Sequence, residues 1–149
     1  MIIDDKLMKY VVFKKRTEAE IRRKCNQLSY TEEYTDSIIE YLTENEYIND
    51  IKYVEKYINN VLKLKKSSVL EIKMDLMRRG IDEKYIESYI DNNIEELEEF
   101  EEQCAIQLLN KKAQSMELEK VKRYLKGKGY TYKSISNAID NYKNLEDNN

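Results

Sequence analysis

The sequence predicts an all-α fold built from a tandem repeat, and three observations lead to that prediction. The 149-residue chain has no proline and only three glycines, whereas folds made of many short strands need many turn residues. Apolar residues recur three and four positions apart, which is the period of a helix. A pattern of about fifty residues occurs three times. We therefore expect an elongated, curved, solenoid-like array of three tandem three-helix repeats.

The repeat is clearest in three segments that align without gaps and begin at Leu28, Arg79 and Lys128. Each has a small residue that ends one helix in the left-handed conformation, then an apolar residue, then a residue able to cap the next helix. The helix-ending residues are Ser29, Gly80 and Gly129, and the capping residues are Thr31, Asp82 and Thr131. The repeat therefore places a helix on each side of the same turn three times.

Apolar spacing and these turns predict nine helices along the chain. Their expected ranges are 4–14, 17–28, 31–44, 50–64, 68–79, 82–92, 95–112, 117–127 and 131–142. Helices 17–28, 68–79 and 117–127 each carry apolar residues four and eight positions before the small residue, and 31–44, 82–92 and 131–142 follow a capping residue. The longer helices rest on apolar stripes: Leu7, Tyr10 and Val11, then Ile51, Val54, Ile58 and Val61, then Leu97, Phe100, Cys104 and Leu108.

No linker rich in proline, glycine or serine divides the chain, so we expect one domain over residues 1–149. Its expected parts are an N-terminal helix (1–14), repeat 1 (15–64), repeat 2 (65–112), repeat 3 (113–143) and a frayed tail (144–149). Three helices cannot bury their apolar faces alone, so neighbouring repeats should pack against each other.

Composition also excludes several kinds of chemistry. The chain has no histidine, which rules out imidazole catalysis and histidine-ligated metals. Cys25 and Cys104 are far apart and form no CxxC motif, so we expect free thiols, no metal and no cofactor. No apolar stretch is long enough to span a membrane, and we expect a cytoplasmic protein that is not an enzyme.

Other motifs have simpler structural interpretations. The segment Gly127–Ser134 lacks the spacing of a phosphate loop and suits a helix end and turn. The acidic run 95–102 lacks calcium-binding spacing and is expected to be a solvated helix face. Most of the thirteen tyrosines lie on apolar stripes and are expected to pack in the core, with base stacking by one or two as the alternative.

Charge alternates along the chain in the rhythm of the repeat. Residues 81–102 contain ten acidic residues and one basic residue, whereas residues 1–30 contain eight basic and four acidic residues. Solubilising faces with internal pairing explain any one cluster, but recurrence favours a basic stripe directed at phosphate or an acidic protein. The predicted contact residues are Arg22, Arg23, Lys65, Lys66, Arg78, Arg79, Lys122 and Arg123.

Four stretches together resemble the RecX family of regulatory proteins, in their order and spacing. They are Thr17–Lys24, Tyr47–Ile58, Lys66–Glu87 and Arg123–Ile135. Within the second stretch, Tyr47, Asn49, Asp50 and Tyr53 match the signature turn and helix of the family, and Glu46 stands where the family usually has glycine. We expect Asn49 and Asp50 to cap a helix, Tyr47 and Tyr53 to pack between helices, and Gly80 and Gly129 to serve backbone geometry.

The resemblance implies a non-enzymatic regulator of recombination and DNA repair. Its implied partner is the RecA recombinase filament on single-stranded DNA, in whose groove it would limit filament extension, ATPase activity and strand exchange. Because the net charge of −3 is acidic, we expect direct DNA binding to be weak or indirect, and we expect a monomer. The alternatives are a helical-repeat scaffold for another protein and a small nucleic-acid-binding protein that acts alone.

Overall fold

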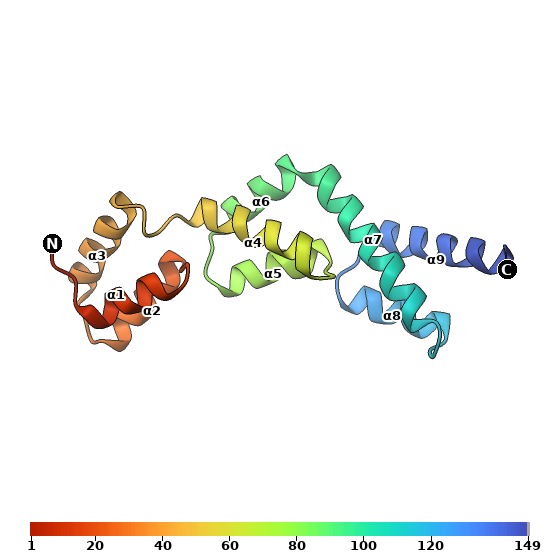
Figure 1. The fold of residues 1–149 in the computed structure, drawn as a ribbon, viewed down its shortest axis with the longest axis horizontal. Helices are drawn as coiled ribbons and strands as arrows, with labels where there is room; N and C mark the ends of the chain where they lie inside the picture. The colour runs from red at the N-terminus through yellow and green to blue at the C-terminus, as the bar shows by residue number, and fades with distance from the viewer. Residues whose placement is uncertain (149) are drawn as a thin grey trace. The chain divides into compact units, whose positions relative to one another are not determined.

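A computed structural model describes residues 1–148, and this part of the chain contains nine α-helices and no strand (Figure 1). The helices are α1 (Asp5–Phe13), α2 (Glu18–Gln27), α3 (Glu32–Glu44), α4 (Asp50–Leu64), α5 (Val69–Arg78), α6 (Glu83–Asn92), α7 (Ile94–Lys112), α8 (Leu118–Gly127) and α9 (Tyr132–Asp147). The all-α prediction is confirmed, and the first eight helices agree with their predicted ranges to within one residue at each end.

The last helix is longer than predicted. It runs to Asp147, and Asn148 is its C-cap residue, so the prediction of a frayed tail is wrong for residues 144–148. Residue 149 lies outside the described part of the chain. Between Tyr142 and Asn148 there is no glycine or proline to end the helix, and successive backbone hydrogen bonds therefore continue.

Hydroxyl or carboxylate side chains cap several helices, as the sequence predicts. Thr31 and Thr131 are the N-cap residues of α3 and α9, and their side chains accept hydrogen bonds from the backbone N–H groups of Tyr34 and Ser134. Asp82 accepts from the backbone N–H of Lys84. Each contact satisfies an N–H that has no partner within its own helix.

The three helix-ending residues all have positive φ, as expected: 61° for Ser29, 83° for Gly80 and 91° for Gly129. At each end, the following residue donates its backbone N–H to a carbonyl five residues earlier, and the left-handed residue donates to one three residues earlier. This pair of hydrogen bonds closes the last turn of the helix. Glu46 adopts the same conformation at the end of α3, with a φ of 61°.

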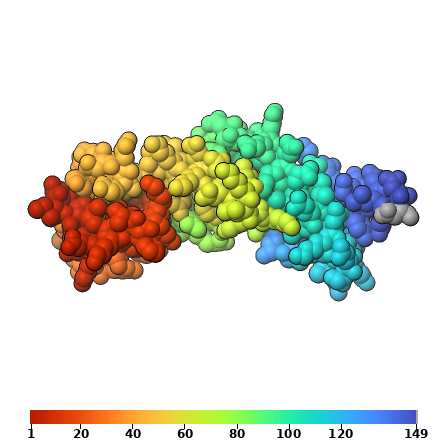
Figure 2. All heavy atoms as spheres, viewed as in Figure 1, coloured from red at the N-terminus to blue at the C-terminus, as the bar shows by residue number. Residues whose placement is uncertain are grey.

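The chain divides into two compact units, each described by itself. Unit 1 contains Met1–Tyr57 and Leu76–Glu87. Its core is a cluster of buried apolar side chains from α1 and the residues before it, α2, α3 and the turn after α3. In this unit, α1 and α2 form much of the face turned to the viewer in Figure 2 (red). The cluster consists of Ile3, Leu7, Val11, Ile21, Cys25, Ile38, Ile39, Leu42 and Ile48.

Unit 2 contains Ile58–Asp75 and the described residues from Ser88 onward. In this unit α7 packs along α9, and α8 contacts both helices. Its core cluster is Cys104, Ala105, Leu109, Val121, Leu125, Tyr130, Ile135 and Ala138. These residues recur three and four apart along each helix, which is the pattern from which the helices are predicted.

Candidate functional site

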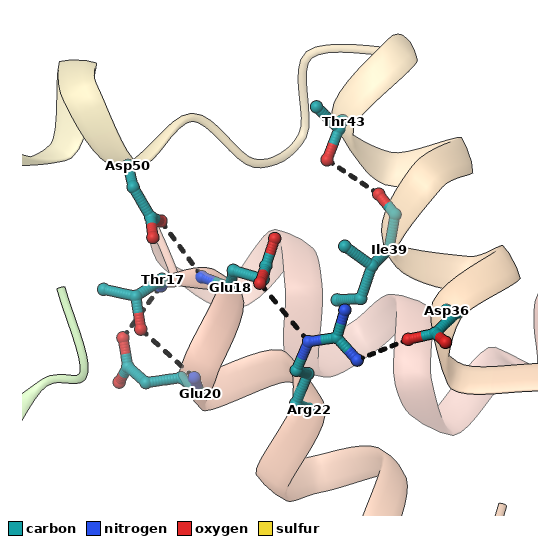
Figure 3. Close-up of polar contacts among 8 residues, drawn as sticks. All are labelled: Thr17, Glu18, Glu20, Arg22, Asp36, Ile39, Thr43 and Asp50. Carbon is teal, nitrogen blue, oxygen red and sulfur yellow. Dashed lines mark hydrogen bonds and ion pairs between the residues drawn. The ribbon is translucent and has the colours of Figure 1, made fainter. Parts of the chain in front are cut away.

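Arg22, one of the predicted contact residues, is held by two carboxylates inside unit 1. Its Nη1 lies 2.7 Å from Oδ1 of Asp36 on α3, and its Nε lies 3.3 Å from Oε2 of Glu18 on α2 (Figure 3). The hydrogen bond to Asp36 is the main reason that the pKa of Arg22 is raised. Arg22 therefore links α2 to α3, and a partner would have to compete with both carboxylates.

Arg79, another of the predicted contact residues, is half-buried. Its Nη1 donates a hydrogen bond of 2.6 Å to the hydroxyl of Tyr53, and its guanidinium lies 4.9 Å from the ring centre of Tyr57. The two tyrosine rings are stacked on α4, with centres 6.4 Å apart. Tyr53, Tyr57 and Arg79 therefore form one packed group.

The other six predicted contact residues are exposed. Arg23 and Arg78 lie in unit 1, and Lys65, Lys66, Lys122 and Arg123 lie in unit 2. The sequence signals basic residues on every first helix of the repeat, but it does not reveal which of them are used for packing. Partner contact at these six positions remains a prediction.

The signature turn before α4 has one expected and two unexpected features. Asn49 caps α4 by accepting the backbone N–H of Lys52 at 3.0 Å, as predicted. Tyr47 is 40% exposed, so its predicted packing role is wrong, and the neighbouring Ile48 is buried instead. Asp50 does not cap its own helix. It accepts the backbone N–H of Glu18 at 3.0 Å and so caps α2 (Figure 3).

Thr17 lies at the centre of a joint between sequence repeats 1 and 2, within unit 1. It is fully buried, and its hydroxyl donates to the carbonyl of Arg79 at 2.7 Å. The same hydroxyl accepts from the backbone N–H of Glu20, whose side chain accepts from the backbone N–H of Thr17 (Figure 3). A Cβ on Gly80 would overlap the Cβ of Ala19. The start of α2 therefore fits directly onto the end of α5.

Ser68 forms the same joint between sequence repeats 2 and 3, within unit 2. It is fully buried, its hydroxyl donates to the carbonyl of Lys128 at 2.6 Å, and it shares reciprocal capping hydrogen bonds with Glu71. A Cβ on Gly129 would lie 2.9 Å from the Cβ of Leu70. The start of α5 therefore fits onto the end of α8. These joints explain why both positions carry glycine, beyond the positive φ that the sequence indicates.

Glu101 is the main residue that the sequence analysis missed. It is only 2% exposed, so the prediction that the acidic run is a solvated face is wrong at this position. One carboxylate oxygen accepts the backbone N–H of Val69, and the other accepts the hydroxyls of Thr131 and Ser134 at 2.9 and 2.6 Å. Glu101 lies four residues from Leu97 and from Ala105, both buried on α7. This spacing was the available signal.

The buried thiols do not provide reactive groups. Cys25 and Cys104 are both free and buried, and burial is the main cause that raises the pKa of each thiol. A raised pKa disfavours the thiolate, which is the nucleophilic form. Within residues 1–148, no group of three or more His, Cys, Asp and Glu residues is placed to hold a metal ion.

None of the helices in the described part of the chain combines the length and apolar character needed to cross a membrane. The features that stand out are instead the two joints and the exposed cations of the first helices in each repeat. These features are suited to a binding surface presented on packed helices.

The comparisons with known proteins point to one family. No family model matches the chain. The regulatory protein RecX of Clostridium acetobutylicum is 28% identical over 132 residues, which cover 83% of this chain and 61% of that protein. The regulatory protein RecX of Clostridium perfringens is 30% identical over 140 residues, covering 88% and 64%. This chain therefore spans about three fifths of the length of these curated relatives.

The fold matches two solved structures. The crystal structure of RecX from Lactobacillus salivarius has a TM-score of 0.78 and 24% identity, with 92% of each chain covered. A second crystal structure, of a regulatory protein RecX, has the same TM-score and 21% identity, covering 91% of this chain and 70% of that one. The sequence relatives extend the likeness beyond the fold. The chain is therefore similar in sequence and in fold to regulatory proteins named RecX.

Proposed function

We propose that this protein is a non-enzymatic, cytoplasmic regulator of the RecA recombinase. It binds the recombinase filament on single-stranded DNA, and it lowers filament extension, ATPase activity and strand exchange. The observation that carries this proposal is the similarity to regulatory proteins named RecX, which extends over 83% or more of the chain in several relatives.

The arrangement of two predicted contact residues supports this role. Arg23 and Arg78 are exposed on the first helices of successive repeats, and the Thr17 joint fastens those two helices to each other within unit 1. Exposed arginines on helices held together in this way can bind carboxylates on a protein surface with defined geometry. A filament offers the same surface many times, so contacts that are weak individually add up through effective concentration.

The test is a titration of the single-stranded-DNA-dependent ATPase of the cognate recombinase with this protein. We expect inhibition well below one molecule per recombinase subunit, because a regulator that blocks filament growth acts on many subunits at once. An ATPase rate that stays unchanged up to an excess of the protein would contradict the proposal and favour a helical-repeat scaffold with another partner.

The contact residues are tested by reversing Arg23 and Arg78 to glutamate together. We expect the half-inhibiting concentration to rise about tenfold, because both side chains are exposed, and helicity and the unfolding midpoint are measured alongside to separate lost binding from lost stability. The matched control reverses Lys52 and Lys56, two exposed cations on α4. Equal inhibition by the two double variants would remove Arg23 and Arg78 from the interface. Arg79 is unsuitable for this test because its loss would also disturb Tyr53.

A further inference from the structure

The third repeat carries an unusual distribution of charge. Residues 120–139, called here the carboxylate-free segment, contain six basic residues and no aspartate or glutamate, in a chain that has 29 acidic residues. The segment includes most of α8 and the first half of α9. Its basic residues are Lys120, Lys122, Arg123, Lys126, Lys128 and Lys133.

All six cations of this segment are exposed. The buried face of α8 is formed by Val121 and Leu125, so the lysines and the arginine lie on the opposite, outward face, and part of α8 (light blue) reaches the surface in Figure 2. The first helices of the other two repeats differ, because Arg22 is held by two carboxylates and Arg79 by two tyrosines. The third repeat therefore presents exposed cations, whereas in each of the other two repeats at least one arginine is held by neighbouring side chains.

Gly127 gives this surface an open backbone. It is the last residue of α8, and a Cβ placed on it would meet no atom within 4 Å. Glycine destabilises a helix relative to alanine, and neither a positive φ nor a close neighbour requires it here, unlike at Gly80 and Gly129. Gly127 follows Arg123 by one turn on the outward face. A missing side chain at this place leaves room for a ligand to approach the backbone between cations.

Tyr132 adds an exposed aromatic ring. It is 81% exposed and is the first residue of α9, four residues after Lys128. Four residues of chain span at most about 14 Å, and the exposed Lys133 directly follows Tyr132, so the backbone places this ring near Lys128 and Lys133. An aromatic ring beside cations is the combination that binds single strands, because unpaired bases stack on the ring while phosphates pair with the cations. The bases of a duplex are already stacked on each other.

We propose that the carboxylate-free segment binds single-stranded nucleic acid directly, with phosphates on the outward face of α8 and a base stacked on Tyr132. This interaction needs no recombinase, so it goes beyond the proposed function. It also differs from the weak or indirect DNA binding that the acidic net charge predicts.

The test measures the anisotropy of a labelled oligo(dT) of about 15 nucleotides as the full chain is added, over a range of salt concentrations. We expect saturable binding that weakens steeply as salt rises, because phosphate contacts release counterions. Reversal of Lys122 and Lys126 to glutamate should weaken binding more than tenfold and reduce its salt dependence. The matched control reverses Lys52 and Lys56, which have the same spacing on α4 and are equally exposed, and should leave binding nearly unchanged.

Substitutions of Tyr132 and Gly127 test the stacking of a base on the ring and the approach of the ligand to the backbone, separately from the charge of the cations. Tyr132→Ala should weaken binding about tenfold, and Tyr132→Phe should retain it, because stacking uses the ring and not the hydroxyl. Gly127→Ala should raise the thermal unfolding midpoint and yet weaken binding. A purely structural role for Gly127 would not produce this combination of gain in stability and loss in affinity.

The proposal is overturned if the wild-type chain does not bind oligo(dT), if both double reversals weaken binding equally, or if Tyr132→Ala binds as well as the wild type. It is also overturned if polyglutamate competes as well as oligo(dT), since the surface would then be one for an acidic protein. The same variants are assayed for inhibition of the recombinase ATPase. Inhibition without any binding of oligo(dT) would overturn this proposal and leave the proposed function standing.

Discussion

The two joints of this protein use the same parts but differ in the carboxylate that completes them. In unit 1 the parts are the hydroxyl of Thr17, the carbonyl of Arg79, Gly80 and Asp50. In unit 2 they are the hydroxyl of Ser68, the carbonyl of Lys128, Gly129 and Glu101. Asp50 and Glu101 occupy equivalent places, because each accepts the N–H of the first residue of the capped helix.

The difference lies in how many helices the carboxylate connects. Asp50 is partly exposed and accepts the N–H of Glu18. Glu101 is buried and bonds both the start of α5, at Val69, and the start of α9, at Thr131 and Ser134. Glutamate has one more methylene than aspartate, and the start of α9 supplies hydroxyls. A small change of residue therefore turns a connection between two helices into a connection among three.

The largest expected effect is on the glycines of the joints. Gly80→Ala should destabilise the protein by about 4 kcal/mol, because the backbone at this position has a positive φ and the new Cβ would overlap the side chain of Ala19. Gly129→Ala should cost about 2 kcal/mol, since Leu70 is half exposed and its side chain can move. Both are measured as changes in the free energy of unfolding by denaturant.

Two controls sharpen this prediction. Gly127→Ala, in an open helical position, should stabilise the protein by about 1 kcal/mol. Combining Gly80→Ala with Ala19→Gly should recover part of the loss, and the coupling measured by the double-mutant cycle should be favourable. Additive effects of the two substitutions would mean that the overlap with Ala19 does not cause the loss.

The second prediction contrasts the two carboxylates. Glu101→Gln should destabilise the protein by about 3 kcal/mol, because the amide has one acceptor oxygen in place of two, and its NH2 group would face the backbone N–H of either Val69 or Thr131. Asp50→Asn should have little effect at low pH, since its amide oxygen can still accept the N–H of Glu18. A loss of equal size at both positions would show that the joints are not different after all.

The pH dependence at Asp50 follows from its raised pKa, of which burial is the main cause. A carboxyl whose pKa is higher in the folded than in the unfolded protein favours folding when protonated. Its contribution is complete below the unfolded pKa and is lost as pH rises through the folded pKa. Asp50→Asn should therefore gain stability relative to the wild type as pH rises above about 4, the usual pKa of an aspartate, as measured by denaturation at a series of pH values.

The third prediction concerns the buried hydroxyls. Thr17→Ala and Ser68→Ala should each cost about 2 kcal/mol, because each removes a helix cap and leaves a carbonyl without its donor. Thr17→Ser keeps the hydroxyl and should retain most of the stability, as seen in the unfolding midpoint. If Thr17→Ser were as damaging as Thr17→Ala, packing of the methyl group would matter more than the hydrogen bond.

The smallest expected effect is at the two left-handed positions that carry a side chain, Ser29 and Glu46. Substitution by glycine should stabilise the protein by about 0.5 to 1 kcal/mol at each, because glycine adopts positive φ without the steric cost of a Cβ. Both residues are exposed, so the change should not disturb packing. A decrease in the thermal midpoint of either variant would contradict this expectation.

The helices and their ends could be predicted from the sequence because they depend on local interactions. Capping by Thr31, Asp82 and Thr131 involves residues two or three positions away, and the left-handed ends at Gly80 and Gly129 involve only one turn. Apolar spacing determines the buried face of each helix. The family resemblance was visible for a related reason, since its motifs are these turns and helix starts.

The tertiary structure decided what each polar residue does. Arg79 and Glu101 look like surface residues in the sequence, but one packs on two tyrosines and the other fastens three helices. Asp50 caps α2, 32 positions before it, instead of its own helix. These partners lie far apart in the chain, so no local pattern reveals them. The sequence by itself determined where helices form and end, and packing between distant segments determined which charges are buried and which remain on the surface.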